Sequence, residues 1–238
     1  MSPQLSVVIL CYKAGKKVHR FVTVMKESLD KRGIAYEIVL VGNFNAHEVY
    51  TDNTPAVVRA LAQRDPRVIA VVEEKKGMFG WDVRSGLARA SGDIVAFIDG
   101  DGQMPADDVV RAYDEMLRQG TDMAQTFRVK RHDGLQRLFI SRLYNALLRL
   151  LFPKVSVYDA NAKPKLFRRE AFEKLSLNAD DWFIDAEIVI QAAYKGLTIA
   201  EVPTVFHKNA HRSSFVKAKD LVDFLINLIH YRLRGRVR

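Results

Sequence analysis

Short apolar runs alternate with amphipathic stretches through the first half of the chain. Each apolar run has the length of a buried strand, and the runs occupy residues 5–10, 36–42, 68–73 and 93–99. The stretches between and after them show helical spacing of apolar residues, and they cover residues 16–33, 54–65, 83–91 and 106–120. This alternation predicts an α/β fold in which a mostly parallel sheet is flanked by helices.

The second half of the chain is less regular. Residues 133–152 and 182–196 have the spacing of amphipathic or buried helices, and residues 165–175 predict a strand that enters a helix. Residues 197–206 predict a strand, and Pro203 favours an edge position for it because proline donates no hydrogen bond. We expect one domain over residues 1–218 and a basic amphipathic helix over residues 219–238.

Composition limits the class of protein. A chain of 238 residues that is 48% hydrophobic can bury a sizeable core. Its one cysteine, Cys11, allows no intrachain disulfide and fits a reducing compartment. No run approaches the roughly 20 apolar residues that cross a bilayer, and no basic signal-peptide region precedes the first run. These features indicate a cytoplasmic location.

Charge points to anionic partners. Thirty-seven basic and 28 acidic residues give a net charge of +9, which suits nucleic acid, acidic lipid or phosphorylated small molecules. A basic nucleic-acid-binding protein usually carries a recognisable binding module, and the sequence contains none. We therefore expect no nucleic-acid partner.

Two aspartates follow the fourth apolar run, in the stretch VAFIDGDGQMP at residues 95–105. Ligands bind at the carboxyl ends of the strands in a parallel sheet, so Asp99 and Asp101 lie where chemistry is expected. Carboxylates at this spacing can hold Mg²⁺ or Mn²⁺ together with substrate phosphates, and the side-chain oxygen of Gln103 can add a ligand. The sequence therefore predicts a metal site of Asp99, Asp101 and Gln103.

The same residues have other interpretations. A polar turn explains aspartates and glycines after a strand. An EF-hand requires ligands at later loop positions that this loop lacks. A haloacid-dehalogenase-type phosphatase also has two aspartates one residue apart, but usually on its first strand. His207 and His211, four residues apart, are a further metal candidate with no helical context.

Several motifs in order resemble family 2 glycosyltransferases, which have the GT-A fold. They are LSVVILCYK at residues 5–13, GDIVAFIDGDGQMPADDV at 92–109 and GLTIAEVPTVFH at 196–207. The extended pattern Asp99-x-Asp101-x-Gln103-x-Pro105 is similar to that of the dolichyl- and polyprenyl-phosphate sugar transferases. Residues 127–152, 157–172 and 183–203 match the same subgroup, and the resemblance covers residues 5 to about 217.

The resemblance implies an inverting, metal-dependent enzyme that takes a sugar from a GDP- or UDP-linked donor. Donor-binding candidates by this resemblance are Cys11, Tyr12, Lys13, Asn43, Lys76, Arg84, Asp99, Arg212 and Ser214. Arg212 and Ser214 match a loop that covers the donor, although Ser213 replaces the family's glycine. The second strand also departs from the family, because VLVGNFNA has Asn43 where an acidic pair usually holds the base and ribose. The nucleotide therefore stays open.

The acceptor implied by the resemblance is a polyprenyl phosphate. Arg128, Arg131, Arg137 and Ser141 are the candidates for its phosphate, which arginine can bind through two hydrogen bonds. Asp159, Asp185 and Glu187 match acidic family positions. Asp159, with Arg128 and Arg131, is the catalytic candidate; the roles of Asp185 and Glu187 stay open. A lipid phosphate is already anionic, so an acid near it would orient groups rather than act as a base.

Membrane contact and acceptor class have alternatives. The apolar face of residues 133–152 is typical of a helix in a membrane interface, and equally of a helix on the core. For the basic tail helix we expect surface association with a membrane. A soluble family 2 enzyme with a sugar or protein hydroxyl as acceptor is the alternative function. The oligomeric state is not indicated by the sequence.

Overall fold

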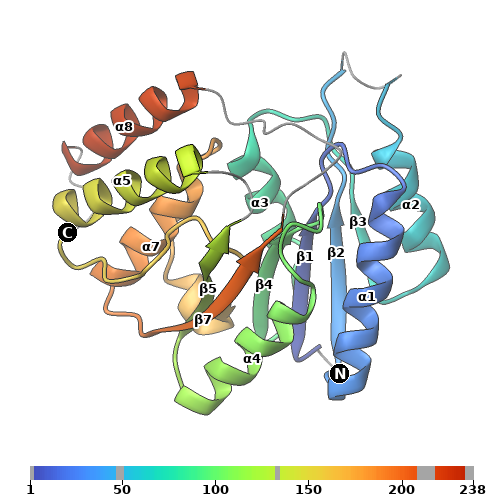
Figure 1. Ribbon diagram of the computed structural model, residues 1–238. Coiled ribbons are helices and arrows are strands. Elements are labelled where there is room, and N and C mark those ends of the chain that lie inside the picture. The colour runs from blue at the N-terminus through green and yellow to red at the C-terminus, as the bar shows by residue number, and fades with distance from the viewer. Residues whose placement is uncertain (1–2, 47–50, 132–134, 208–217, 234–238) are drawn as a thin grey trace.

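The chain folds around one seven-stranded sheet. The computed structural model describes residues 3–46, 51–131, 135–207 and 218–233. Over these residues the strand order is β3-β2-β1-β4-β6-β5-β7 (Figure 1). The strands are β1 (Leu5–Leu10), β2 (Tyr36–Val41), β3 (Val68–Val71), β4 (Ile94–Asp99), β5 (Met123–Arg131), β6 (Lys165–Arg168) and β7 (Ile199–Phe206).

Helices connect the strands and cover both faces of the sheet (Figure 1). They are α1 (Lys17–Arg32), α2 (Thr54–Arg64), α3 (Phe79–Leu87), α4 (Asp107–Gln119), α5 (Leu135–Leu151), α6 (Arg169–Glu173), α7 (Ile184–Tyr194) and α8 (Ala218–Leu233). The α/β fold class with a C-terminal helix is confirmed. The short helix expected at residues 83–91 begins earlier, at Phe79.

The sheet is parallel in its first half and mixed in its second. β1 pairs in parallel with β2 and β4, and β2 pairs in parallel with β3. β6 is antiparallel to both β4 and β5, while β7 is parallel to β5 and lies at the edge. The edge position that Pro203 favoured is confirmed, whereas the nine-residue strand β5 was not predicted.

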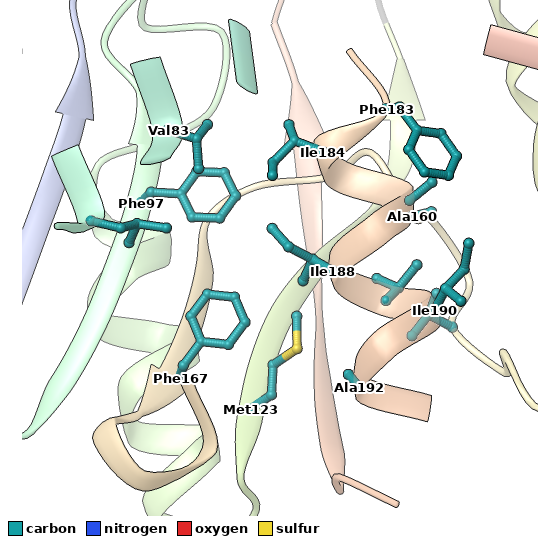
Figure 2. Packing of buried hydrophobic residues seen from close by; sticks show 14 of the residues in the cluster. Val83, Phe97, Met123, Ala160, Phe167, Phe183, Ile184, Ile188, Ile190 and Ala192 are labelled. Atoms are coloured by element: carbon teal, nitrogen blue, oxygen red, sulfur yellow. The ribbon is translucent and has the colours of Figure 1, made fainter. Parts of the chain in front are cut away.

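Alternate residues of the strands feed two separate cores. Val7, Ile9 and Ile98 belong to the core beneath α1, α2 and α4. The opposite faces of the same strands contribute to a core under α3, α5, α7 and α8. Figure 2 shows this second core, where Phe97, Phe167 and Met123 of the sheet face the buried side of α7. The strands are continuous apolar runs in the sequence because helices cover both faces of the sheet.

Backbone hydrogen bonds bring the carboxyl ends of four strands to one edge. The Cys11 N–H donates to the Val41 carbonyl, and the Gly42 N–H donates to the Val71 carbonyl. The Gly100 N–H donates to the Leu10 carbonyl at 2.9 Å. The predicted donor segments and the aspartate motif therefore meet at this edge, as the parallel topology requires.

Helix α8 is part of the second core. Leu228 and Tyr231 are buried there, and the Tyr231 ring lies 5.2 Å from that of Phe183. Its neighbour is α5, which lies beside it in Figure 1. The division of the chain at residues 218 and 219 stays a prediction, but α8 shares its core with the preceding residues.

Close packing of α3 on the sheet depends on Gly86. A Cβ at this position would lie 2.4 Å from Val8 Cγ1 and 2.6 Å from Val41 Cγ2. We expect Gly86→Ala to lower the free energy of unfolding by about 1–3 kcal/mol, because a packed core resists added volume. Urea denaturation followed by circular dichroism measures this. Ala88→Ser at the exposed end of the same helix is the control, and an equal effect in both variants would contradict the account.

Candidate functional site

The aspartate motif forms a tight loop after β4. The Asp101 carboxylate accepts a hydrogen bond from the Gln103 N–H at 3.0 Å, and Gly102 adopts φ 74°. The Gln103 side-chain amide donates to the His207 carbonyl at 3.2 Å, and the His207 N–H donates to the Gln103 carbonyl at 2.8 Å. These hydrogen bonds therefore fix the loop to the end of β7, although the loop and β7 are far apart in the sequence.

These residues fit a divalent ion that shares its ligands with a substrate. Asp99 and Asp101 offer carboxylate oxygens from one loop, and the Asp99 side chain is 29% exposed. The Gln103 side-chain nitrogen donates to the His207 carbonyl, so the ligand that this side chain can offer is its amide oxygen. Among the described residues, no three His, Cys, Asp or Glu side chains cluster as a metal site. Such an ion would take its other ligands from water or diphosphate oxygens, which suits Mg²⁺ or Mn²⁺.

Lys163 lies directly beside the aspartate motif. Its Nζ is 2.7 Å from an Asp185 oxygen on α7 and 3.8 Å from an Asp99 oxygen. The same ammonium group lies 4.5 Å from the centre of the Phe79 ring. Burial lowers the pKa of Lys163, but the Asp185 and Asp99 carboxylates outweigh it and raise the pKa above its usual value. Lys163 is therefore a buried cation at this edge of the sheet.

Lys165, the first residue of β6, is a second buried cation on the same carboxylate. Its Nζ donates to the Ala160 and Ala162 carbonyls, both at 2.7 Å, and lies 3.6 Å from Asp185 Oδ1. Burial lowers the pKa of Lys165 to about 8. The Asp185 carboxylate thus lies between two ammonium groups and is itself buried.

Asp159 forms the other buried ion pair of the site. Its two oxygens accept hydrogen bonds from Arg128 Nε at 2.5 Å and Nη2 at 2.8 Å. Burial raises the pKa of Asp159, but the Arg128 guanidinium more than offsets this and lowers the pKa to about 2. The structure therefore brings two of the predicted catalytic residues together, as partners of each other.

Glu187, the third predicted acid, lies on α7 two residues after Asp185. Its carboxylate accepts hydrogen bonds from the backbone N–H groups of Asn178 and Ala179 at 2.9 and 2.8 Å. Glu187 is buried and holds the segment that leads into α7. Its contacts are those of a residue that orders this segment.

The first strand end places an aromatic ring at the expected donor side. The Tyr12 hydroxyl accepts a hydrogen bond from Asn45 at 3.0 Å, and Lys75 Nζ lies 4.4 Å from the centre of its ring. Lys13 is exposed with φ 54°, the left-handed region. Cys11 is fully buried, and burial raises the pKa of its thiol well above its usual range. Tyr12 and Lys13 are therefore the members of this group that reach the surface.

Asn43 has internal partners where the family usually has an acidic pair. Its amide nitrogen donates to Asp82 at 3.0 Å and to the Ser85 hydroxyl at 2.9 Å, and its oxygen accepts from the Glu73 N–H at 2.9 Å. Asp82 also pairs with Lys75, and burial raises the pKa of Asp82. Asn43 joins β2 to α3, so a nucleoside contact by its side chain stays a prediction.

Lys76 and Arg84 lie on either side of the start of α3. Lys76 Nζ is 5.9 Å from the centre of the Trp81 ring, and Arg84 pairs with Asp180. The Met78 N–H donates to the Asp180 carbonyl at 2.7 Å. This loop is therefore closely packed on the segment before α7, and the roles of Lys76 and Arg84 in donor binding stay predictions.

Several residues of the predicted acceptor and donor sets lie wholly or partly outside the described residues. The backbone of Arg131 lies in β5 and that of Arg137 in α5, but their side chains lie outside the described residues. Arg212, Ser214 and His211 also lie outside them. Ser141 is half-buried on α5, and its carbonyl accepts a hydrogen bond from Asn145 at 2.8 Å.

Sequence reasoning missed the two buried lysines. Lys163 and Lys165 stand in the stretch ANAKPKLF, immediately before and within a buried strand. Lysine is almost never fully buried unless it is paired. Two lysines leading into an apolar strand were therefore a signal for acidic partners from elsewhere in the chain.

Comparison with known proteins identifies the family. Residues 6–176 match the family described as glycosyl transferase family 2. The chain belongs to this family. The match covers β1 through α6 and includes the aspartate motif and both buried lysines.

This family 2 chain aligns with three curated relatives over most of its length. It is 28% identical to the glycosyltransferase AglD of Haloferax volcanii over 84% of the chain and 32% of that protein. It is 26% identical to the dolichol-phosphate mannosyltransferase of Pyrococcus furiosus over 97% of the chain and 63% of the relative. It is 25% identical to the polyprenol monophosphomannose synthase of Mycolicibacterium smegmatis over 78% of the chain and 74% of the relative. The chain thus spans about a third of the first and under two thirds of the second.

Solved structures confirm the GT-A fold. Glucosyl-3-phosphoglycerate synthase from Mycobacterium tuberculosis in complex with UDP superposes with a TM-score of 0.71 at 21% identity. The alignment covers 98% of this chain and 79% of that one. The same enzyme has been crystallised with Mn²⁺ and UDP and with Mg²⁺ and UDP, at TM-scores of 0.68.

The Arg128–Asp159 pair makes stability depend on pH in a defined direction. The pKa of Asp159 falls from its usual 3.8 to about 2 on folding, so its ionised form stabilises the protein above about pH 4. This stabilisation is lost as the pH falls from 4 toward 2. We expect Asp159→Asn to lower the free energy of unfolding at pH 7 by about 2 kcal/mol or more, since Arg128 is left buried with its pair broken.

Urea denaturation from pH 7 to pH 2.5 tests this effect. The gap between wild type and Asp159→Asn should narrow as the pH falls. Asp114→Asn removes the exposed pair with Arg32 and is the matched control, with an expected loss below about 1 kcal/mol. A gap that is constant over the whole range would show that Asp159 does not stabilise the fold through its charge.

Proposed function

We propose that this protein is a metal-dependent, inverting glycosyltransferase that transfers a sugar from a nucleotide sugar to a polyprenyl phosphate. The main observation in support is that the two carboxylates on the acceptor side, Asp159 and Asp185, are paired with basic side chains. Asp159 is bound by Arg128 through two hydrogen bonds, and Asp185 lies between Lys163 and Lys165. Each carboxylate is buried with its negative charge matched by cations.

This arrangement suits an acceptor that brings its own nucleophile. A hydroxyl acceptor needs a general base that takes up its proton during transfer. Protonation of Asp159 would break the charge match with Arg128, which a pKa of about 2 strongly opposes. A phosphate monoester is already ionised at neutral pH and needs no such base. The ion pairs of Asp159 and Asp185 therefore favour an acceptor that is a phosphate over one that is an alcohol.

The donor half is the edge formed by the ends of β1, β2 and β4. Asp99, Asp101 and Gln103 would hold Mg²⁺ or Mn²⁺, which neutralises the charge that develops on the leaving diphosphate. Tyr12 and Lys13 lie beside this loop at the end of β1, where a nucleoside would contact them. The solved relatives that contain UDP together with Mn²⁺ or Mg²⁺ support this half of the proposal.

The acceptor half extends toward α5 and α8. Among the side chains of these two helices that the structure describes, five large apolar ones are exposed: Leu143, Leu150, Ile226, Ile229 and Leu233. Arg142, Arg149 and Arg232 are exposed on the same helices. A surface that combines apolar and basic side chains favours contact with anionic membranes, where a polyprenyl phosphate resides. No helix among the described residues is long and apolar enough to cross a bilayer.

Relatives support the same acceptor class. The names of the Pyrococcus furiosus and Mycolicibacterium smegmatis proteins specify a dolichol phosphate and a polyprenol monophosphate. The undecaprenyl-phosphate 4-deoxy-4-formamido-L-arabinose transferase of Edwardsiella ictaluri, 26% identical over 94% of the chain, specifies another lipid phosphate. We propose a peripheral location on the cytoplasmic membrane face for this protein.

Direct transfer tests the proposal. The protein is incubated with labelled GDP- and UDP-sugars, polyprenyl phosphate in vesicles and Mn²⁺, and lipid-linked sugar is separated by chromatography. We expect product with at least one donor and a loss of roughly 10²-fold or more in kcat/KM for Asp101→Asn, because a charge-stabilising ligand is removed. Asp114→Asn, an exposed aspartate on α4, is the matched control.

Two outcomes would contradict the proposed function. The first is transfer to sugar or protein hydroxyls with none to polyprenyl phosphate, which would favour a soluble family 2 enzyme. The second is undiminished transfer by wild type in the presence of a chelator, or by Asp101→Asn in the presence of Mn²⁺, which would show that no metal ion at the aspartate motif takes part.

A further inference from the structure

Lys163 is a fixed positive charge beside the metal-binding loop. Its Nζ lies 3.8 Å from an oxygen of Asp99, the strand-end member of the aspartate motif. Its closer partner is Asp185 at 2.7 Å, and the Asn161 carbonyl lies at 3.4 Å. The function proposed above uses this lysine only to match the charge of Asp185, although it is the cation nearest to Asp99 among the ion pairs that the described residues form.

Contacts from several elements hold this ammonium group in place. Asp185 is on α7, and Phe79, whose ring centre is 4.5 Å from Nζ, opens α3. The Phe79 ring stacks on that of Trp182 at 5.1 Å. The Lys163 N–H also donates to the Met104 sulfur at 3.3 Å, just beyond the aspartate motif. A lysine anchored in this way cannot move far when an ion approaches Asp99.

We propose that Lys163 makes metal binding at Asp99 and Asp101 depend on the donor diphosphate. A divalent ion bound by Asp99 would lie within a few ångströms of the Lys163 ammonium group, and the two positive charges would repel each other. The ammonium group also lies 3.8 Å from one of the two Asp99 oxygens, and it would compete with an ion for that oxygen. Both effects weaken metal binding to the protein alone. This inference rests on the proposed function, and it makes Lys163 a positioning residue that acts through Asp99.

The donor reverses the sign of this effect. A nucleoside diphosphate brings two or more negative charges to the same edge, and these are attracted by both the metal ion and Lys163. Nucleotide therefore offsets the repulsion that the ion meets in the free protein. Because coupling between two ligands is reciprocal, the metal ion must strengthen nucleotide binding by the same factor. The site thus favours a metal–nucleotide pair over either ligand alone.

A purely structural role makes a different prediction. If Lys163 only neutralises the buried Asp185 carboxylate, its replacement changes the free energy of unfolding and leaves the intrinsic metal affinity of the aspartate motif unchanged. If it acts on Asp99, its replacement tightens the binding of metal to the nucleotide-free protein. Metal affinity without nucleotide therefore separates the two roles and does not depend on catalysis.

The test measures Mn²⁺ binding by loss of the free-ion electron paramagnetic resonance signal. Wild type and Lys163→Met are titrated with Mn²⁺ alone and with Mn²⁺ plus UDP or GDP, and nucleotide binding is measured separately in chelator. We expect Lys163→Met to bind Mn²⁺ alone at least about tenfold more tightly, the scale of the repulsion between a unit charge and a divalent ion about 5 Å apart at a water-like dielectric constant near 80. In the presence of a chelator, Lys163→Met should bind UDP or GDP several-fold more weakly than wild type does.

Matched variants keep the test decisive. Lys154→Met replaces another lysine that lies over an aromatic ring, 5.0 Å from the centre of Tyr194, and should leave both affinities unchanged. If Lys163→Met alone does not fold, Lys163→Met is compared within the Asp185→Asn background, because replacing both partners leaves no isolated buried charge from the pair. The same tightening is expected there.

The outcomes separate this inference from the proposed function. If wild type holds Mn²⁺ with nucleotide but Lys163→Met leaves the affinity for Mn²⁺ alone unchanged or weaker, the inference is overturned and the function stands. If wild type binds Mn²⁺ neither alone nor with UDP or GDP, the metal-dependent function fails and the inference fails with it.

Discussion

The site depends on ion pairs between charged side chains that lie largely inside the protein. Arg128 of β5 pairs with Asp159, and Lys163 and Lys165, before and within β6, share Asp185 of α7. Leaving one of these charges buried without its partner would cost several kcal/mol, so the pairs fix how the second half of the sheet and α7 meet. The aspartate motif is tied into this arrangement through Lys163.

The same pairs divide the chemistry between the two halves of the site. Asp99 and Asp101, at the edge of the parallel half, keep partial access to solvent and suit a metal ion with a diphosphate. Asp159 and Asp185, in the mixed half, are buried and matched by cations. Carboxylates of the first kind can bind ligands, whereas those of the second kind position the groups around them. This difference favours an acceptor that carries its own negative charge.

The sequence predicted the features that depend on local order. The aspartate motif follows an apolar run, and the end of a run can be read without knowledge of distant residues. Strand β5 escaped prediction because its polar residues have partners that are remote in sequence. Gln125 and Thr126 are buried, and Arg128 is half-buried beside Asp159. Lys163 and Lys165 escaped for the same reason, since burial of a lysine makes sense only once Asp185 is seen beside it.

The central claim is that no protein carboxylate acts as the base in transfer. The most direct test is the pH dependence of kcat/KM with polyprenyl phosphate and with the matching phosphonate, whose second ionisation lies at higher pH. The account predicts that activity rises with the acceptor's own second ionisation, near pH 6 for a phosphate monoester, and that the rise moves upward with the phosphonate. A rise at the same pH for both acceptors would place the base on the protein and contradict the account.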